Sequence, residues 1–527
     1  MKKTMPYPLH DATLRSDVPR RAGSSRVALA VRYALVAPLL GLPLAPAQAV
    51  DYYWDVNDAA AGSGGPSPHG TWSSLDATLS SDSAGASAVS ARTTTTADRL
   101  LFSAGADATG PYTISVSGTQ SIGRITFQDG VVNLTGGTIN FGAINGLIDG
   151  DATPDSISAV LSGSNGIRFS GGTVTLNGAA PNTYTGTTRV GGSGLAQATL
   201  VLAASGGNAV SGNLLQLGGN NYTSAGIVRL GAAEQINDTA TVQLNAGHYS
   251  GSSSFSLNGF DETIGGINLH KQGNASSVVF RNGGASDATV TLAGSGTYST
   301  ASGDRQGGRS IQNGGAGRLH VVVALTGSGS QTFGGIDPTY TGTTTVNSGT
   351  LRLWNTSAWA SDAILNGGTL ALHQTALGTG TLAGAATRTH APTIGGTGGT
   401  LAKTGDGTVI LSGANTYRGA TRIDAGTLRA GSASAFGIDS AVSLANVAGA
   451  TLDLGGFDIG IGSLAGGGAT GGNVLLGAAD LTVGTDDTST AYGGAISGTG
   501  SVTKTGSGTL ALTGTNGYSG EIGRAHV

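Results

Sequence analysis

Apolar and polar residues alternate along this chain in many short runs. Two examples are Thr408-Val409-Ile410-Leu411 and Thr509-Leu510-Ala511-Leu512. An alternation with period two places one set of side chains on a buried face of a β-strand. Threonine and valine suit such strands because branching at Cβ restricts χ1. Glycine and asparagine lie between the runs and favour tight corners. The pattern therefore predicts short strands that are separated by sharp turns.

The alternating pattern belongs to a repeated unit. Its fullest copy covers residues 399–428, and a partial copy covers residues 501–520 with every landmark displaced by 101 positions, as from Tyr417 to Tyr518. Weaker copies occur near 182–200, around Tyr184, and near 339–351, around Tyr340. A fixed pattern of glycines, alternating apolar residues and one tyrosine indicates a repeated structural unit.

The spacing of the copies favours a solenoid. The four tyrosines are separated by 156, 77 and 101 residues, whereas a β-propeller would show a steadier period of about 40–50 residues. A solenoid tolerates loops of any length at its corners. Coils of roughly 20–25 residues give about 20 coils. At ~4.8 Å per coil they form a rod on the order of 90–110 Å long.

The alternation also predicts which side chains point inward. The residues expected in the core are Leu401, Val409, Leu411, Ile423, Leu428, Leu510 and Leu512, and those expected outside are Thr408, Ile410, Thr421 and Arg422. Tyr417 and Tyr518 are expected to close a corner, with the ring packed and the hydroxyl in water.

The conserved positions of the unit resemble the passenger-associated transport repeat of bacterial autotransporters. The matching residues are Leu401, Lys403, Gly405, Gly407, Val409, Leu411, Gly413, Asn415, Tyr417, Gly419, Ile423, Gly426 and Leu428 in the full copy, and Gly506, Leu510, Leu512, Asn516 and Tyr518 in the later one. Val409 and Ile423 depart slightly from the family pattern, and Pro338 replaces the asparagine that precedes Tyr340 by two positions. An internal pair of segments, 257–267 and 454–464, also supports repetition. The mature start at 52–57 resembles the opening of autotransporter passengers.

The resemblance implies a fold and a function. The expected fold is an all-β, right-handed parallel β-helix, truncated at its C-terminus. The expected function is that of a surface-displayed, adhesin-like passenger whose repeats assist folding and outer-membrane translocation. The implied partners are a translocator barrel that this chain lacks, the outer-membrane assembly machinery, and an unidentified ligand on a host or neighbouring cell.

The N-terminus carries an export signal. Seven basic residues precede an apolar segment from Tyr33 to Ala47, and Ala47-Gln48-Ala49 fits a cleavage site before Val50. The apolar segment is shorter than a membrane span and contains three prolines. The expected organisation is a signal peptide at 1–49, an N-terminal cap at 50–110, the β-helix at 111–520 and a tail at 521–527 that is foreign to the native protein.

Composition narrows the classes of partner. The chain has 93 glycines, no cysteine and 11% charged residues. Removal of residues 1–49 changes the net charge from −4 to −9, because basic residues fall from 26 to 19 and acidic residues from 30 to 28. This acidity argues against nucleic acid as a partner. The absence of cysteine suits a chain that crosses a narrow pore unfolded, although a compositional accident explains it equally well.

The sequence predicts no catalytic, cofactor or metal site. The eight histidines are scattered, and no nucleophile-elbow or zinc motif occurs. Asp149, Asp151 and Asp155 form the best calcium candidate, but a simple turn is favoured because the spacing of a calcium loop is missing. Trp354 and Trp359 are candidates for stacking on sugar or, more commonly, for covering a corner of the coil.

Two further functional hypotheses remain open. Some β-helices are exported polysaccharide lyases or hydrolases, whose paired carboxylates come from successive coils. Alternatively, the fragment is only a stalk and folding scaffold.

Overall fold

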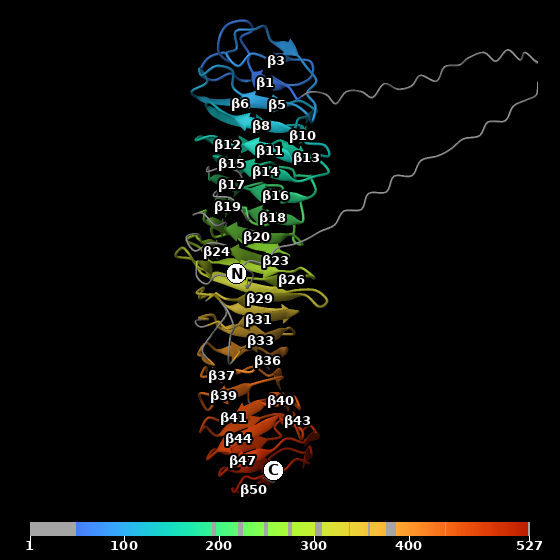
Figure 1. The fold of residues 1–527 in the computed structure, drawn as a ribbon, viewed down its shortest axis with the longest axis vertical. Helices are drawn as coiled ribbons and strands as arrows, with labels where there is room; N and C mark the ends of the chain where they lie inside the picture. Colours follow the sequence, from blue (N-terminus) through green and yellow to red (C-terminus); the bar gives the residue numbers. More distant parts are fainter. Residues whose placement is uncertain are drawn as a thin grey trace, which may run out of the picture. The chain divides into compact units, whose positions relative to one another are not determined.

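Short parallel strands stack one above another to form a β-solenoid (Figure 1). The computed structural model describes residues 49–191, 197–219, 225–246, 251–271, 277–300, 308–336, 338–356, 359–375, 386–437 and 439–524. Within these ranges the chain forms strands and no helix, so no helix is present that could cross a membrane. The predicted signal peptide lies outside the described residues, except for Ala49 at its end. The predicted all-β parallel solenoid is confirmed.

The strands form three faces of the solenoid, and some windings have strands on only two of them. The first face consists of an 11-stranded sheet and then a 10-stranded sheet. Their strands, in stacking order, are β4(Ser90–Ala91), β3(Ala77–Ser80), β1(Asp51–Trp54), β5(Arg99–Phe102), β8(Arg124–Phe127), β11(Gly146–Asp149), β14(Ile167–Ser170), β16(Thr187–Val190), β18(Leu214–Leu217), β20(Thr241–Ala246) and β23(Gly266–Lys271), followed by β26(Thr297–Ser299), β29(Ser330–Gly334), β31(Thr350–Trp354), β33(Thr369–His373), β36(Thr400–Thr404), β38(Ala420–Ile423), β40(Ala441–Leu444), β43(Ser463–Gly466), β46(Thr490–Tyr492) and β49(Leu510–Leu512).

The second face consists of a 10-stranded sheet and a 6-stranded sheet. The strands are β2(Gly70–Trp72), β6(Pro111–Val116), β9(Val131–Thr135), β12(Pro154–Ile157), β15(Thr173–Leu176), β17(Ala198–Leu202), β19(Gly226–Leu230), β21(Ser253–Ser256), β24(Val278–Arg281) and β27(Arg309–Gln312), followed by β34(Thr387–His390), β37(Thr408–Leu411), β39(Thr427–Ala430), β41(Thr451–Asp453), β44(Asn473–Gly477) and β47(Ile496–Gly498).

The third face consists of three smaller sheets. The strands are β7(Thr119–Ser121), β10(Thr138–Asn140) and β13(Val160–Ser162); β22(Glu262–Ile264), β25(Ala288–Leu292), β28(Leu319–Ala324), β30(Thr344–Ser348), β32(Ala363–Leu365) and β35(Ile394–Gly395); and β42(Ile459–Ile461), β45(Leu481–Val483), β48(Val502–Lys504) and β50(Ile522–Arg524).

The windings are irregular in length. Paired residues on neighbouring parallel strands are as little as 19 positions apart, as for Thr350 and Thr369, and as much as 48 positions apart, as for Asp51 and Arg99. The solenoid has about 17 turns, somewhat fewer than the roughly 20 expected from a uniform coil. Windings longer than the assumed 20–25 residues account for the difference.

Columns of aligned apolar side chains fill the interior. On the first face, Leu100 pairs with Ile125, which pairs with Ile148 in the next winding and then with Phe169. All four side chains are fully buried. Each such side chain contributes about 1.5–3 kcal/mol on leaving water, so the stack is stabilised winding by winding.

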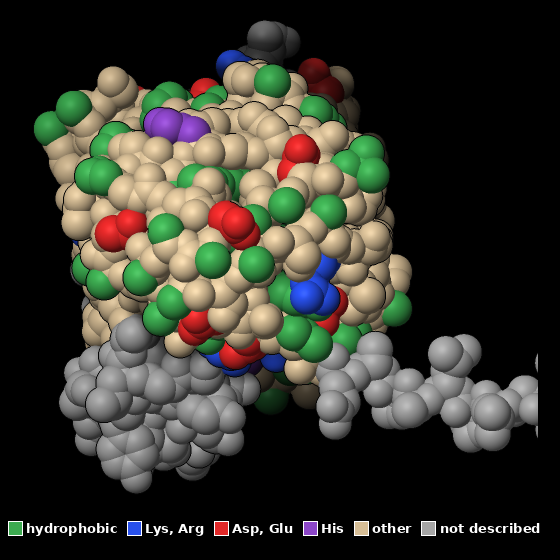
Figure 2. Space-filling view, turned by 90° about the horizontal axis from the view of Figure 1, so that it is seen from above, with side chains coloured by type: hydrophobic (Ala, Val, Ile, Leu, Met, Phe, Trp, Pro, Cys, Tyr) green, Lys and Arg blue, Asp and Glu red, His purple; other side chains and the backbone are tan. Residues whose placement is uncertain are grey.

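The N-terminal end of the stack is covered by the strands that break the parallel pattern. β3 pairs antiparallel with β1 and β4. Beneath them Trp54 and Phe102 pack with ring centroids 5.9 Å apart, and Trp72 is fully buried. Viewed from above, this end shows scattered apolar and acidic side chains among polar ones rather than one apolar surface (Figure 2). The first winding is therefore closed toward water.

Candidate functional site

Three copies of the repeat place a tyrosine hydroxyl inside the solenoid. The Tyr417 hydroxyl lies 2.7 Å from the hydroxyl of Thr421, which in turn lies 2.8 Å from that of Ser440 in the next winding. Tyr184 and Tyr340 make the same bond to the threonine four residues on, at 2.6 Å and 2.7 Å. The repeat thus carries a tyrosine–threonine pair that is satisfied within the core.

This pair corrects two predictions about the corner. Thr421 was expected outside, but it is fully buried because it lies between Leu401 and Val442 in an inward column. The Tyr417 hydroxyl was expected in water, but it is buried, and burial raises the pKa of this phenol. Burial likewise raises the pKa of Tyr340 to about 12. These phenols stay neutral and donate or accept hydrogen bonds only.

The asparagine of the repeat joins three windings. The Asn415 side chain accepts a hydrogen bond from the Ile394 N–H at 2.8 Å and donates one to the Ala435 carbonyl at 2.7 Å. Asn182 makes the equivalent pair of bonds, to Leu161 and Ala209. Such bonds satisfy corner backbone groups that no strand ladder reaches. Pro338 has no side chain able to do this in the second copy.

The lysine of the repeat lies on an inward column. Lys403 is fully buried between Leu372 and Ile423, and its ammonium donates to the carbonyl oxygens of Thr404, Gly405 and Ala425 at 2.6–3.0 Å. Burial lowers the pKa of Lys403 to about 8. Lys504, in the later copy, also donates to the two carbonyls that follow it. In both copies the lysine therefore binds corner carbonyl groups, and in the full copy it contributes no exposed charge.

The glycines of the repeat allow tight turns and close packing between windings. Gly405 and Gly426 adopt φ angles of +76° and +66°, which favour glycine. Gly407, Gly413 and Gly419 lie so close to the preceding winding that an added Cβ would come within 3.0 Å of other atoms. These positions demand glycine for geometry rather than for chemistry.

The apolar residues of the full copy lie inside, and those of the later copy are only partly covered. Leu401, Leu411, Ile423 and Leu428 have no exposed surface, and Val409 is 5% exposed. Ile410 and Thr408 are half-buried and Arg422 is exposed. In the last winding, Leu510, Leu512 and Tyr518 are partly buried against the core, and Gly506 and Asn516 are exposed. Ala49 and Val50, the predicted cleavage pair, are exposed.

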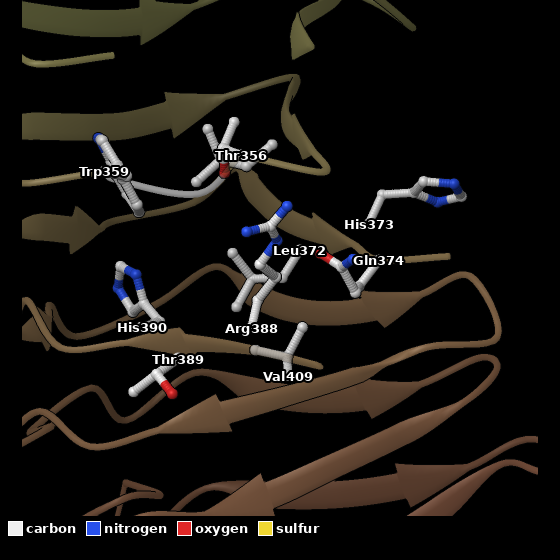
Figure 3. Close-up of a pocket in the computed structure, with 10 residues that line it drawn as sticks. Thr356, Trp359, Leu372, His373, Gln374, Arg388, Thr389, His390 and Val409 are labelled. Carbon is white, nitrogen blue, oxygen red and sulfur yellow. The ribbon is translucent and has the colours of Figure 1, made fainter. Parts of the chain in front are cut away.

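A second candidate is a small cleft lined by Trp359, His390, Arg388 and the apolar residues beside them (Figure 3). Trp359 stacks on His390 with ring centroids 4.9 Å apart, and only 7% of Trp359 is exposed. The His373 ring points away from these two rings in Figure 3 and packs edge-on against Trp354 at 5.4 Å. The accessible space is about 30 Å³, which holds a water molecule or two rather than a sugar ring.

The cleft has no acid–base pair. Burial lowers the pKa of both His373 and His390 to about 4, so both rings are neutral near pH 7. The Arg352 guanidinium lies over Trp354 and 2.6 Å from Nδ1 of His373. Trp359 therefore covers the coil, whereas Trp354 is half-buried between Arg352 and His373.

The three aspartates of the candidate calcium site interact with different partners. Asp149 pairs with Arg124 and Ser170, Asp151 accepts from Thr153, and Asp155 is buried, with one oxygen accepting from the Val132 N–H at 2.9 Å. Within the described ranges, no group of three or more histidine, cysteine or acidic side chains is arranged to hold a metal ion.

Comparison with known proteins identifies the repeats. The family model described as passenger-associated-transport-repeat matches residues 170–194, 325–353, 401–430 and 502–522. The chain is also 38% identical over 274 residues to the adhesin BmaC autotransporter of Brucella suis biovar 1 (strain 1330). That alignment covers 45% of this chain but only 8% of the adhesin. No solved structure matches the chain.

Proposed function

We propose that this chain, an autotransporter passenger whose parallel β-solenoid carries passenger-associated transport repeats, is displayed at the outer-membrane surface and acts there as an adhesin-like scaffold. One observation supports the role of the repeats most directly. Their tyrosine, asparagine and lysine side chains satisfy polar groups of the adjoining windings from inside the column. The polar groups of a repeat winding are therefore satisfied once it packs against its neighbours, without a contribution from a distant part of the chain.

Such windings suit folding during passage through a pore. Each strand of a new winding finds a ready edge on the winding that has already folded, and each buried column grows by one residue. Contacts are made between neighbours, so folding propagates along the axis. Windings that form outside the membrane cannot slip back while they are folded. The repeats would then bias translocation outward.

A pair of matched deletions tests this role. Thr400 pairs with both Thr369 and Ala420, so removal of residues 400–419 takes out one repeat winding in register. Ala441 pairs with Ser463, so removal of 441–462 takes out one winding that no repeat covers. Both deletions are made in a parent that carries a translocator barrel, and surface display is measured with an antibody on intact cells.

Loss of 400–419 is expected to reduce surface display several-fold more than loss of 441–462. Equal display of the two deletion variants would contradict a special role for the repeats. The proposed export route is checked separately: the N-terminus of the secreted protein should be Val50, as determined by mass spectrometry. The translocator barrel and the outer-membrane assembly machinery are the partners that this route requires.

The similarity to an adhesin favours a non-enzymatic passenger over an exported polysaccharide lyase or hydrolase. Purified protein incubated with acidic and neutral polysaccharides is expected to leave their chain length unchanged. Turnover that disappears on mutation of a single aspartate or glutamate would replace this proposal with the enzymatic one.

A further inference from the structure

Asparagine is followed directly by glycine at several corners of the solenoid. Within the described ranges, the asparagines of these pairs are Asn145, Asn165, Asn177, Asn258, Asn282, Asn313, Asn366 and Asn516. Such a pair is chemically labile, because glycine has no Cβ to hinder the approach of its backbone nitrogen to the amide carbon of the asparagine. Reaction requires an amide that can turn and an N–H that is free, so the structure determines which pairs can react.

Six of these asparagines have side-chain amides that are hydrogen-bonded within the chain. Asn282 is the most constrained: its side chain is fully buried, donates to the carbonyl oxygens of Ser286 and Arg318, and accepts from the Gly259 N–H. The six asparagines are Asn165, Asn258, Asn282, Asn313, Asn366 and Asn516. An amide held in this way must break a hydrogen bond before it can turn toward the next residue, so these six pairs are protected.

The remaining two asparagines, Asn145 and Asn177, are exposed, and their side chains make no hydrogen bond among the described residues. They differ in the glycine that follows. The Gly146 N–H donates to the Gly166 carbonyl oxygen at 3.0 Å, whereas the Gly178 N–H makes no hydrogen bond in the described part of the chain. Among the described pairs, Asn177–Gly178 alone combines an unbound amide with an unbound backbone nitrogen.

Asn177 lies at the corner that follows β15, and this corner contacts the windings on both sides. The Asn177 N–H donates to the Ile157 carbonyl oxygen at 3.1 Å, and the Gly178 carbonyl oxygen accepts from the Ser205 N–H at 3.0 Å. β15 itself pairs with β12 in one neighbouring winding and with β17 in the other (Figure 1). The spacing of the main chain at residues 177–178 therefore matters to three windings.

We propose that Asn177 is a site of spontaneous deamidation, a modification whose only co-reactant is water. The Gly178 nitrogen loses its proton and attacks Cγ of Asn177. A bond forms between this nitrogen and Cγ, the bond from Cγ to Nδ2 breaks, and ammonia leaves with the proton. Water then opens the cyclic succinimide. Its addition at Cγ gives aspartate, and its addition at the backbone carbonyl carbon gives isoaspartate, in which the main chain runs through Cβ and Cγ.

The two products affect the corner differently. Isoaspartate lengthens the main chain by one atom between the hydrogen bond donated by the Asn177 N–H and the one accepted by the Gly178 carbonyl oxygen. Both bonds cannot then keep their register with the neighbouring windings. Aspartate adds a negative charge but leaves the main chain unchanged. Isoaspartate at this position would therefore loosen the contact between β15 and β17.

Ageing of the purified, folded full-length chain at mildly alkaline pH tests the proposal. Mass spectrometry of its peptides measures the asparagine that remains at each position, and fragmentation distinguishes aspartate from isoaspartate. The internal control is Asn145–Gly146, which has the same sequence chemistry and an exposed amide but a bound glycine N–H. The same chain in urea supplies the unfolded reference. Asn177→Gln and Asn177→Asp are aged in parallel, and circular dichroism confirms that both are folded.

In the folded protein, Asn177 is expected to deamidate about tenfold faster than Asn145, because Gly146 must first break its hydrogen bond. In urea the two rates should be similar. Hydrogen exchange of the Ser205 amide should become several-fold faster in the aged parent but not in aged Asn177→Gln or in Asn177→Asp, which carries the charge without the longer main chain.

Equal rates at Asn177 and Asn145 in the folded protein would overturn the proposal, as would an Asn177 that reacts only after the protein unfolds. Ser205 exchange that rises equally in Asn177→Asp would contradict the role given to isoaspartate. None of these measurements depends on surface display or on adhesion, so their results leave the proposed function to its own tests.

Discussion

Tyr417 and Tyr518 occupy the same place in two copies of one repeat, yet only Tyr417 has its hydroxyl bonded inside the core. Tyr417 is followed four positions later by Thr421, whereas Tyr518 is followed by Ile522, which is 73% exposed. The contribution of one buried hydroxyl can therefore be measured against a natural counterpart that lacks the threonine partner.

Replacement of Tyr417 by Phe is expected to destabilise its winding by about 1–2 kcal/mol, because the Thr421 hydroxyl loses a buried partner. Tyr518→Phe should cost less than about 0.5 kcal/mol, since that ring is only partly covered. Hydrogen exchange of amides in β36–β40 and β46–β50 measures each local effect. Similar losses in both places would show that the buried hydroxyl pair contributes little.

Asp155 makes stability depend on pH. Burial raises its pKa to about 7 in the folded state, above the ordinary value of 3.8. The folded protein therefore holds this proton more tightly than the unfolded chain does. The associated stability is complete below pH 3.8 and is lost as the pH rises through 7.

Asp155→Asn is expected to remove this dependence. The Asp155 oxygen that accepts from the Val132 N–H has an equivalent in asparagine, and the other carboxylate oxygen has no bonded partner. Relative to the parent, the variant should gain on the order of 2 kcal/mol between pH 5 and pH 8. Urea unfolding at both pH values provides the measurement. A difference from the parent that does not change with pH would mean that Asp155 is ionised in the folded state.

At the scale of the element, a single strand has two unlike faces. Leu411 on β37 is fully buried between His390 and Ala430, whereas Thr408 on the same strand is half-buried. Leu411→Asp is expected to cost more than about 4 kcal/mol, because the carboxylate would be buried and the neighbouring His390, whose pKa burial lowers to about 4, carries no positive charge near pH 7 to pair with it. Thr408→Asp should cost less than about 1 kcal/mol.

Limited proteolysis near residues 386–437 locates the damage from these two strand variants. Cleavage confined to the Leu411→Asp variant is the expected result. If both variants are cleaved alike, the inward column does not hold this strand in place.

The inward aliphatic residues of these strands could be predicted from the sequence, because period-two alternation determines the face on which each of them lies. The prediction was wrong at Thr421, which was placed outside because it is polar although it lies two positions before inward Ile423. No side was predicted for Lys403, which is polar and shares the inward face of Leu401. Their burial depends on partners in other windings: the Tyr417 hydroxyl for Thr421, and corner carbonyls for Lys403. A pattern read along one strand contains no information about these partners.

Two arginines on neighbouring strands illustrate the same limit. Arg168 and Arg189 are 21 positions apart, and only the pairing of β14 with β16 places them side by side. The lengths of the windings vary, so the register of one winding on the next could not be calculated from sequence. The identity of inward leucines could be predicted, but the composition of an outer surface that spans windings could not.

At the scale of the whole molecule, a solenoid should tolerate the loss of a complete winding. Each winding contacts its two neighbours, and the stability of the stack is close to a sum of winding and interface contributions. Removal of residues 441–462 brings Ser463 into the place of Ala441, so β43 can pair with β38. Removal of 441–452 deletes β40 and most of β41. The residues that remain of this winding then no longer align with their partners in the neighbouring windings.

The complete deletion is expected to keep the circular dichroism spectrum of the parent and to melt within a few degrees of it. The partial deletion should melt at least ~5 °C lower, because the inward columns on two faces no longer meet. Both variants remove polar and apolar residues of similar kinds, so composition alone cannot explain a difference between them. Equal melting of the two would mean that stability does not depend on the register between windings, and a stack of aligned columns would then not be what holds this protein together.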